Sequence, residues 1–315
     1  DNNTAVGKDA LLANTTGEAN VAMGGTALDA NTTGHSNVSI GYGSLGANTT
    51  GATNVGVGKE TLFTNTTASD NTAVGNQALY YNAGANNTAV GSAALVANTT
   101  GASNVAVGKS ALAANTTASD NTAIGFEALE ANTTGAGLTG IGRKALEANT
   151  TASNNTAVGY KAMIANTTGT NNVAMGSNAL DAATTGDDCV AIGHNALTAT
   201  TGSGDDNTAV GAYALAANTT ATANVAMGRA AMYANTTGAS NTAIGTSAME
   251  ANTTGDSNVA VGKFALDANT TASNNVAVGS AALGANTTGS VNTAVGSAAL
   301  SANTTGVYNS AVGAY

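Results

Sequence analysis

Two pairs of aspartates are the most evident candidates for metal chemistry in this sequence. Asp187–Asp188 and Asp205–Asp206 flank the one repeated unit that is longer than its neighbours. Ca²⁺ prefers carboxylate oxygens as ligands, so these pairs could hold a calcium ion. An acidic surface loop explains them equally directly, and we favour that interpretation. We therefore assign no metal site and no cofactor from the sequence.

The other reactive side chains are isolated. Cys189 is the single cysteine, which excludes a disulfide within the chain, and it stands where most repeats have asparagine. We interpret it as a tolerated substitution and not as a reactive thiol. His35 and His194 occupy different positions of the repeat. Catalysis needs irreplaceable residues that converge on one place, whereas the recurring residues are Gly, Ala, Asn, Thr or aliphatic. We predict no catalytic residues and no enzyme activity.

The tripeptide Asn-Thr-Thr occurs fifteen times, for example at Asn14, Asn31 and Asn48, and matches the N-glycosylation pattern each time. Sugars on stacked turns about 5 Å apart would collide. We predict instead a ladder of asparagine amides that bond to one another from turn to turn. Threonine columns also suggest an ice-binding face, but adjacent residues of an extended strand point to opposite sides. An ice-binding solenoid with stacked Thr and Asn ladders stays the alternative function.

A repeat of 17 residues must position all of these side chains, and we number its positions from the Asn of "NTAVG". There are eighteen complete repeats and one truncated repeat. One spacing is 16 residues, after Asn71, and one is 18, after Cys189. Both changes fall in the later half of the repeat, which predicts a loop there. The repeats begin at Asn3, Asn20, Asn37, Asn54, Asn71, Asn87, Asn104, Asn121, Leu138, Asn155, Asn172, Cys189, Asn207, Asn224, Asn241, Asn258, Asn275, Asn292 and Asn309.

The columns of the repeat predict an all-β fold, a parallel β-solenoid of the β-roll type. Position 4 is always Val, Ile or Met, position 5 is always Gly, position 9 is Leu or Met, and positions 8 and 11 are Ala in sixteen of eighteen repeats. We expect positions 4 and 9, as in Val6 and Leu11, to fill the interior, and Gly7 to bend the chain. We predict two short strands per turn, "NTAV" and "ALxA", although Ala and Leu are poor strand formers.

The period excludes related architectures and predicts dimensions. The hexapeptide β-helix and the calcium-binding nonapeptide roll have other periods, and a leucine-rich repeat needs about 20 residues. Eighteen turns at about 4.8 Å per turn would make a rod on the order of 85 Å long. We expect residues 1–315 to form a single solenoid domain. The first and last repeats look like interior ones, so we also expect it to be part of a longer chain or a filament.

The first strand of each repeat predicts self-association. Its second position is Thr or Val, its third is nearly always Ala and its fourth is aliphatic, so neither face is polar. A strand that is apolar on both faces is usually buried on both. One face can fill the roll, and we expect the other to pack against another copy of the chain in a symmetric assembly.

Charge excludes some partners. The formal net charge is −10, and a nucleic-acid partner needs a basic footprint. No apolar run is long enough for a bilayer core of about 30 Å. All eight Lys and Arg residues lie at positions 6 and 7, whereas acidic residues occur without any Lys or Arg at position 10 and at the end of the repeat. We interpret these columns as solvated edges, with docking between basic and acidic edges of two copies as the alternative. An extracellular location suits this composition.

The unit "NTAVGxxALxANTTGxx" resembles the YadA-like head repeats of trimeric autotransporter adhesins. It is also similar to the "NTAxGxxALxxNTTG" arrays of phage tail-fibre and bacterial surface proteins. The resemblance covers the whole chain. It implies a left-handed parallel β-roll that assembles as a homotrimer, outside the cell or on a virion, and serves for attachment or as a shaft. Receptor contacts in these families use variable surface residues, so no binding residue can be transferred.

Overall fold

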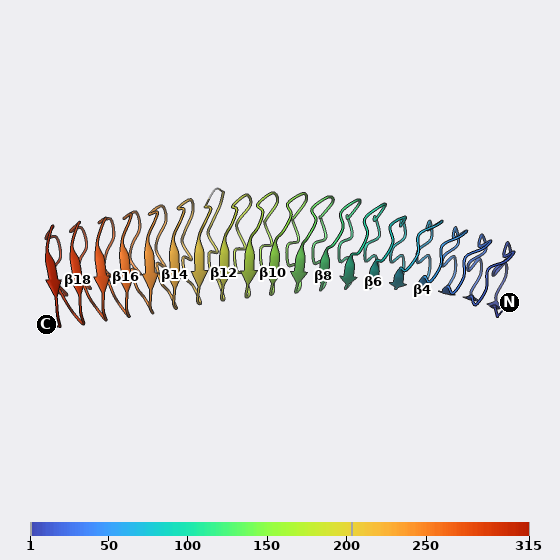
Figure 1. Ribbon diagram of the computed structural model, residues 1–315, viewed down its shortest axis with the longest axis horizontal. Helices are drawn as coiled ribbons and strands as arrows, with labels where there is room; N and C mark the ends of the chain where they lie inside the picture. Colours follow the sequence, from blue (N-terminus) through green and yellow to red (C-terminus); the bar gives the residue numbers. More distant parts are fainter. Residues whose placement is uncertain (1, 203, 315) are drawn as a thin grey trace. The chain divides into compact units, whose positions relative to one another are not determined.

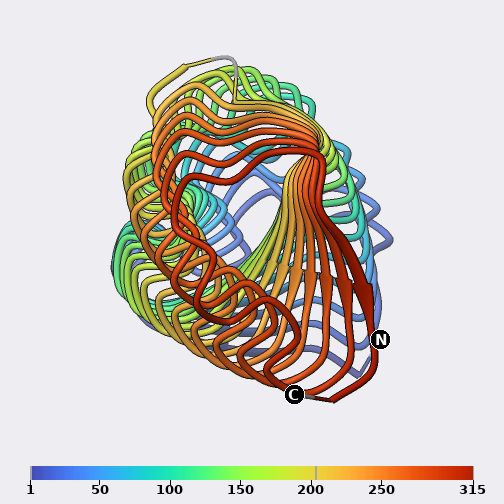
Figure 2. The ribbon, with the colours of Figure 1, turned by 90° about the vertical axis from the view of Figure 1, so that its left-hand side faces the viewer.

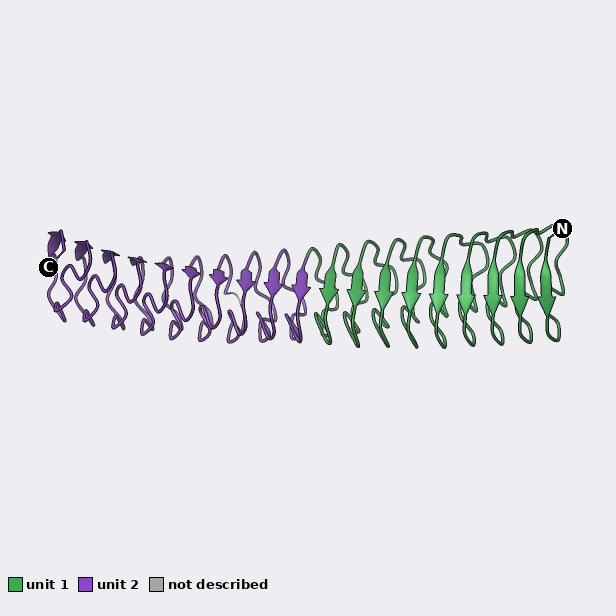
Figure 3. Cartoon of the chain, turned by 90° about the horizontal axis from the view of Figure 1, so that it is seen from below, with its two compact units in different colours: residues 1–154 green, residues 155–315 purple. Residues whose placement is uncertain are grey.

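The structure is a computed structural model that describes residues 2–202 and 204–314. The chain divides into two compact units, Asp1–Asn154 and Asn155–Tyr315, which Figure 3 colours separately. Each unit is a parallel β-solenoid, so the predicted all-β class is confirmed (Figure 1). None of the described residues forms a helix long and apolar enough to cross a membrane.

In the described residues each turn contains one strand of three residues. The strands of the first unit are β1 Thr4–Val6, β2 Val21–Met23, β3 Val38–Ile40, β4 Val55–Val57, β5 Thr72–Val74, β6 Thr88–Val90, β7 Val105–Val107, β8 Thr122–Ile124 and β9 Thr139–Ile141. Those of the second unit are β10 Thr156–Val158, β11 Val173–Met175, β12 Val190–Ile192, β13 Thr208–Val210, β14 Val225–Met227, β15 Thr242–Ile244, β16 Val259–Val261, β17 Val276–Val278, β18 Thr293–Val295 and β19 Ser310–Val312.

Parallel pairing keeps every sequence column in register. Ala5 of β1 pairs with Ala22 of β2, and the flanking residues pair likewise. The short and long repeats keep this register, since Thr72 pairs with Thr88 and Val190 with Thr208. The length changes therefore fall outside the strands, as predicted. In Figure 2 the last turns of the second unit run clockwise as the chain comes toward the viewer, which is a left-handed coil.

The interior of each unit is narrow and filled mainly by small side chains. In the second turn Ala22, Ala27 and Leu28, at positions 3, 8 and 9, are fully buried. Met23, at position 4, is 42% exposed. The prediction that position 4 fills the interior, stated for Val6, is therefore wrong. Adjacent residues of a strand face opposite sides. Leu at position 9 already occupies the narrow interior, so the strand turns its small Ala at position 3 inward and its larger residue at position 4 outward.

The predicted second strand is also wrong, because "ALxA" forms tight turns. The backbone of Leu28 is left-handed, with φ 51°, and so is that of Thr26, with φ 54°. Asn31 N–H closes a turn by donating to the carbonyl of Leu28 at 3.2 Å. Ala and Leu have low strand propensity, so this segment adopts turns whose carbonyls still bond to the adjacent turn.

The glycine at position 5 forms the predicted bend. Gly24 has φ +140°, a conformation that other residues rarely adopt. A Cβ atom there would lie 2.5 Å from the carbonyl oxygen of Gly41 in the next turn. Both backbone conformation and close stacking therefore require glycine in this column.

Candidate functional site

The outward strand face, defined as the side chains at positions 2 and 4, is uncharged, aliphatic throughout position 4, and partly accessible in both units. Position 2 is Thr or Val in every complete repeat and is mostly half-buried, and neither column contains a charged residue. Ile40 of β3 is 38% exposed and Met175 of β11 is 43% exposed. Because the strands are in register, these side chains stack into a stripe along each unit. Exposed members of position 4 are Val6, Met23, Ile40, Val90, Ile124, Met175, Ile192, Met227, Ile244, Val295 and Val312.

The predicted asparagine ladder at position 12 is confirmed within each unit. The Nδ2 of Asn115 donates to Oδ1 of Asn98 at 2.8 Å and to the carbonyl of Ala118 at 3.1 Å. Both asparagines are fully buried. Both hydrogens of the Asn115 amide are thus engaged inside the fold, so this folded side chain offers no free nitrogen for a sugar.

A second asparagine ladder, at position 1, was missed. The N–H of Asn104 donates to Oδ1 of Asn87 at 3.0 Å, and its Nδ2 donates to the carbonyl of Ala118 at 2.9 Å. Asparagine occupies this column in all but two repeats, Leu138 and Cys189. That constancy was the available signal, and it should have predicted a second buried amide column.

The two threonines of Asn-Thr-Thr have different roles. The Oγ1 of Thr99, at position 13, donates to the carbonyl of Thr116 at 2.8 Å. Thr100 and Thr117, at position 14, are exposed. The hydroxyls of position 13 thus largely bond to the backbone of the next turn, even where the side chain is exposed, as at Thr99.

The aspartates considered for calcium take part in hydrogen bonds between turns. Oδ1 of Asp187 accepts from Oγ1 of Thr170 at 3.0 Å, and Oδ1 of Asp205 accepts from the N–H of Asp187 at 3.0 Å. Asp188 and Asp206 adopt left-handed backbone with φ 55° and 58°, which Asp tolerates. Among the described residues, these aspartates do not form a group of three converging ligands. Their hydrogen bonds and backbone conformation account for them.

Cys189 is buried at position 1. Its Sγ lies 3.0 Å from the carbonyl oxygen of Gly204, to which it donates. Burial is the main reason that the pKa of this thiol is raised to about 11, and nearby aspartates add to it. A protonated, buried thiol is a poor nucleophile. This agrees with its interpretation as a tolerated substitution.

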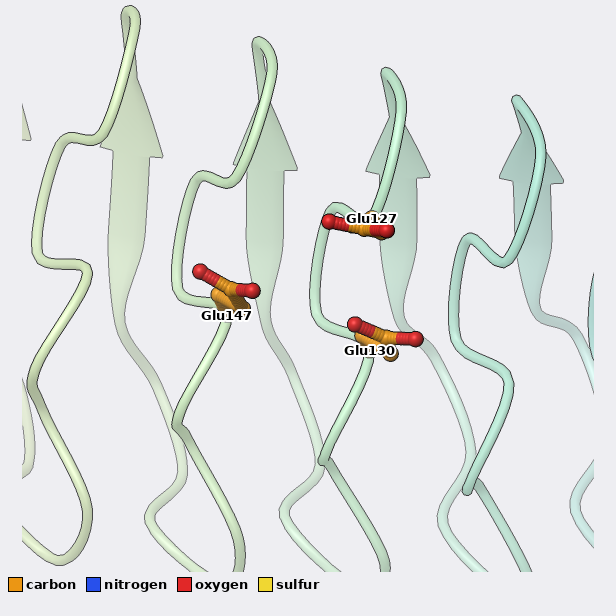
Figure 4. A group of neighbouring side chains, drawn as sticks. All are labelled: Glu127, Glu130 and Glu147. Carbon is orange, nitrogen blue, oxygen red and sulfur yellow. The ribbon is translucent and has the colours of Figure 1, made fainter.

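One acidic group converges in the first unit, and sequence reasoning did not single it out. Glu127, Glu130 and Glu147 bring carboxylate oxygens within 4.8 Å of one another, the one such group in the described part of the chain (Figure 4). Lys144 lies among them, with Nζ 3.0 Å from Oε2 of Glu127 and 2.6 Å from Oε1 of Glu147. These hydrogen bonds raise the pKa of Lys144.

Burial, with the negative charges of its neighbours, raises the pKa of Glu130. The lysine already neutralises part of the group, so we interpret it as an ion-pair network between adjacent turns. The signal available in the sequence was that charged residues at positions 7 and 10 come close together when the turns stack. Basic and acidic edges thus meet within one chain at this point.

No protein-family model matches the chain, and no curated protein matches it. The fold alone therefore defines the class, a repeat protein of the parallel β-solenoid type. The outward strand face recurs in each described turn and is the candidate site on this fold.

Proposed function

We propose that this chain is a segment of an extracellular structural or adhesive fibre that performs no catalysis. Copies associate through the outward strand face, with the homotrimer as the assembly that the repeat resemblance favours. The observation that carries this proposal is the apolar, uncharged stripe at positions 2 and 4, in register along each unit.

The size of the stripe supports an interface. Nine strands about 4.8 Å apart, with side chains about 7 Å apart along a strand, give on the order of 300 Å² in the first unit alone. The largest contiguous apolar patch on a typical monomer covers about 300–600 Å² and is often functional, so a stripe of this size is compatible with an interaction site. Burial of this stripe in an interface removes apolar surface from water, which lowers the free energy by about 25 cal/mol for each Å² buried.

The periodicity of the stripe favours another copy as the partner. A column that repeats once per turn presents ridges at one fixed spacing, and a second copy has the same spacing. The side chains of one copy can therefore pack into the grooves between the side chains of another copy, in a dimer or a trimer. Closed symmetry is the usual result when identical chains share one self-complementary surface.

Introduction of charge on the strand face tests the proposal. The variant Ile40→Lys/Ile124→Lys places two charges on the stripe, at residues that are 38% and 39% exposed. We expect it to sediment as a monomer where the unaltered chain associates. The control Leu12→Lys/Val307→Lys changes residues that are 71% and 49% exposed but lie off the strand face, and should associate normally. Equal behaviour of the two variants would overturn the assigned face.

Ice binding stays a second candidate because one threonine column is exposed. Thr100, Thr117 and Thr134 lie at position 14 of successive turns with their side chains in solvent. The asparagine ladders are buried within the units and contribute nothing to such a face. Thermal hysteresis and ice-crystal shaping by the purified chain test this candidate, and their absence would exclude it.

A further inference from the structure

A hollow in the second unit lies off the strand face. Its volume is about 430 Å³, within the range of small-molecule sites, and its lining comes from three successive turns. The residues occupy positions 6, 7 and 10, which vary between repeats. They are Tyr213, Arg229, Ala230, Tyr233 and Glu250.

Aromatic rings form two walls of this hollow. The centroids of Tyr213 and Tyr233 lie 6.4 Å apart and their planes are inclined at 66°. Both rings are accessible, at 37% and 45% exposure. The ring of His194 packs against Tyr213 with centroids 5.3 Å apart, which supports that ring in place. Ala230, a small and buried residue, also lines the hollow.

Two charged groups line the same hollow without pairing. Within the described part of the chain neither Arg229 nor Glu250 forms an ion pair. This differs from the first unit, where Lys144 at position 7 forms an ion pair with Glu147 at position 10 of the same turn. The hollow therefore combines ring faces, a set of N–H donors and a carboxylate acceptor, all available to a ligand.

We propose that this hollow binds a neutral saccharide. A pyranose ring has an apolar C–H face that can lie against a tyrosine ring, and hydroxyls around its edge that both donate and accept. Glu250 would accept from hydroxyls while Arg229 donates to ring and hydroxyl oxygens, in charge-assisted hydrogen bonds. A nucleotide fits less well, because its phosphates would meet a carboxylate on a chain of net charge −10.

A similar hollow in the first unit supports the proposal independently. Its volume is about 370 Å³, and all of its lining residues except Ala47 lie in the same columns of the repeat. Tyr42 and Phe63 supply aromatic rings, and Asp29 and Glu60 supply carboxylates. Aromatic residues make up only 3% of the chain, so their meeting with carboxylates in both hollows is notable. The inference deepens the adhesive part of the proposed function and rests on it for its biological role.

The test is binding of three neutral probes to the full chain by saturation-transfer difference NMR. The probes are methyl β-glucoside, methyl β-galactoside and N,N′,N″-triacetylchitotriose. We expect saturation transfer from at least one, with Kd on the order of 1 mM. Tyr233→Ala should weaken binding at least tenfold and Glu250→Gln several-fold. Tyr308→Ala, a control 78% exposed and outside both hollows, should leave it unchanged.

Two results would overturn the proposal: no saturation transfer from any probe, or binding that Tyr233→Ala leaves intact. Circular dichroism of each variant verifies that the fold is retained. The strand-face variant Ile40→Lys/Ile124→Lys separates this site from self-association. If that variant and the unaltered chain are both monomeric yet bind the sugar, the association proposal fails and the saccharide site stands.

Discussion

The side-chain amide of Asn115 donates a hydrogen bond of 2.8 Å to Oδ1 of Asn98, which lies one turn earlier in the first unit. Oδ1 of Asn115 in turn accepts from Nδ2 of Asn132 at 3.2 Å. All three side chains are fully buried. A column of amides therefore links successive turns through an interior too narrow for large apolar side chains.

We predict that Asn115→Ala lowers the free energy of unfolding by about 2–5 kcal/mol, because each buried polar group left without a partner costs about 1–3 kcal/mol. Urea unfolding measures this. Thr117→Ala, on an exposed residue two positions later, is the control and should change stability little. A loss at Asn115 no greater than that of the control would show that the ladder contributes no stability.

The left-handed backbone at position 17 predicts a stabilising substitution. Val291 has φ 60° and is 42% exposed. A β-branched residue is strained there by about 1–2 kcal/mol, whereas Asn tolerates the conformation and occurs at the same position as Asn274. Val291→Asn should therefore raise the thermal midpoint, by an amount that corresponds to about 1 kcal/mol.

Val307→Asn is the matched control, since Val307 is 49% exposed and its φ is not positive. It should not raise the midpoint. Equal shifts for the two variants would show that side-chain polarity, and not backbone strain, is responsible.

Two buried threonines should respond oppositely to the same substitution. Oγ1 of Thr200 is buried without a hydrogen-bond partner in the described part of the chain. Oγ1 of Thr61 is also buried, but lies 2.8 Å from Oγ of Ser44. Removal of an unpaired buried hydroxyl is favourable, whereas removal of a paired one leaves its partner unsatisfied.

Thr200→Val should accordingly stabilise the chain by about 1 kcal/mol, and Thr61→Val should destabilise it by about 1–3 kcal/mol. Calorimetry of the thermal unfolding of both variants measures these changes in stability. If Thr200→Val is destabilising, the hydroxyl of Thr200 has a partner after all, such as an ordered water.

The glutamate group predicts a pH-dependent effect. The pKa of Glu130 is raised, first by burial and then by Glu127 and Glu147, above its ordinary value of 4.5. The stability that this group contributes is fully present below that ordinary pKa and is lost as pH rises through the folded-state pKa. Glu130→Gln stays neutral, so it should be more stable than the unaltered chain at pH 7, with a difference that shrinks toward pH 4.

Thermal midpoints at pH 4 and pH 7 test this prediction. Glu18→Gln, at an exposed residue of the same unit, is the control and should show a smaller difference between the two pH values. A gain for Glu130→Gln that is the same at both pH values would contradict the assigned titration.

The sequence columns predicted the solenoid class, the glycine bend, the loop and one asparagine ladder, because stacking in register makes each column a single structural environment. They did not reveal which strand face is inside. Met23 and Ala22 are both apolar, and periodicity alone does not separate a filled interior from an outward stripe. The turn at Leu28 was missed for another reason, since left-handed leucine is rare and propensities argue against it. The hollow at Tyr233 depends on side chains from three turns that follow no column rule.

Sedimentation equilibrium of the unaltered chain tests the central claim, association of copies through the outward strand face, most directly. We expect an associated species, with three times the chain mass of 30.0 kDa as the value for a homotrimer. Its apparent mass should fall toward one chain in Ile40→Lys/Ile124→Lys. A single species of 30.0 kDa over the whole concentration range, in both the unaltered chain and the variant, would contradict it.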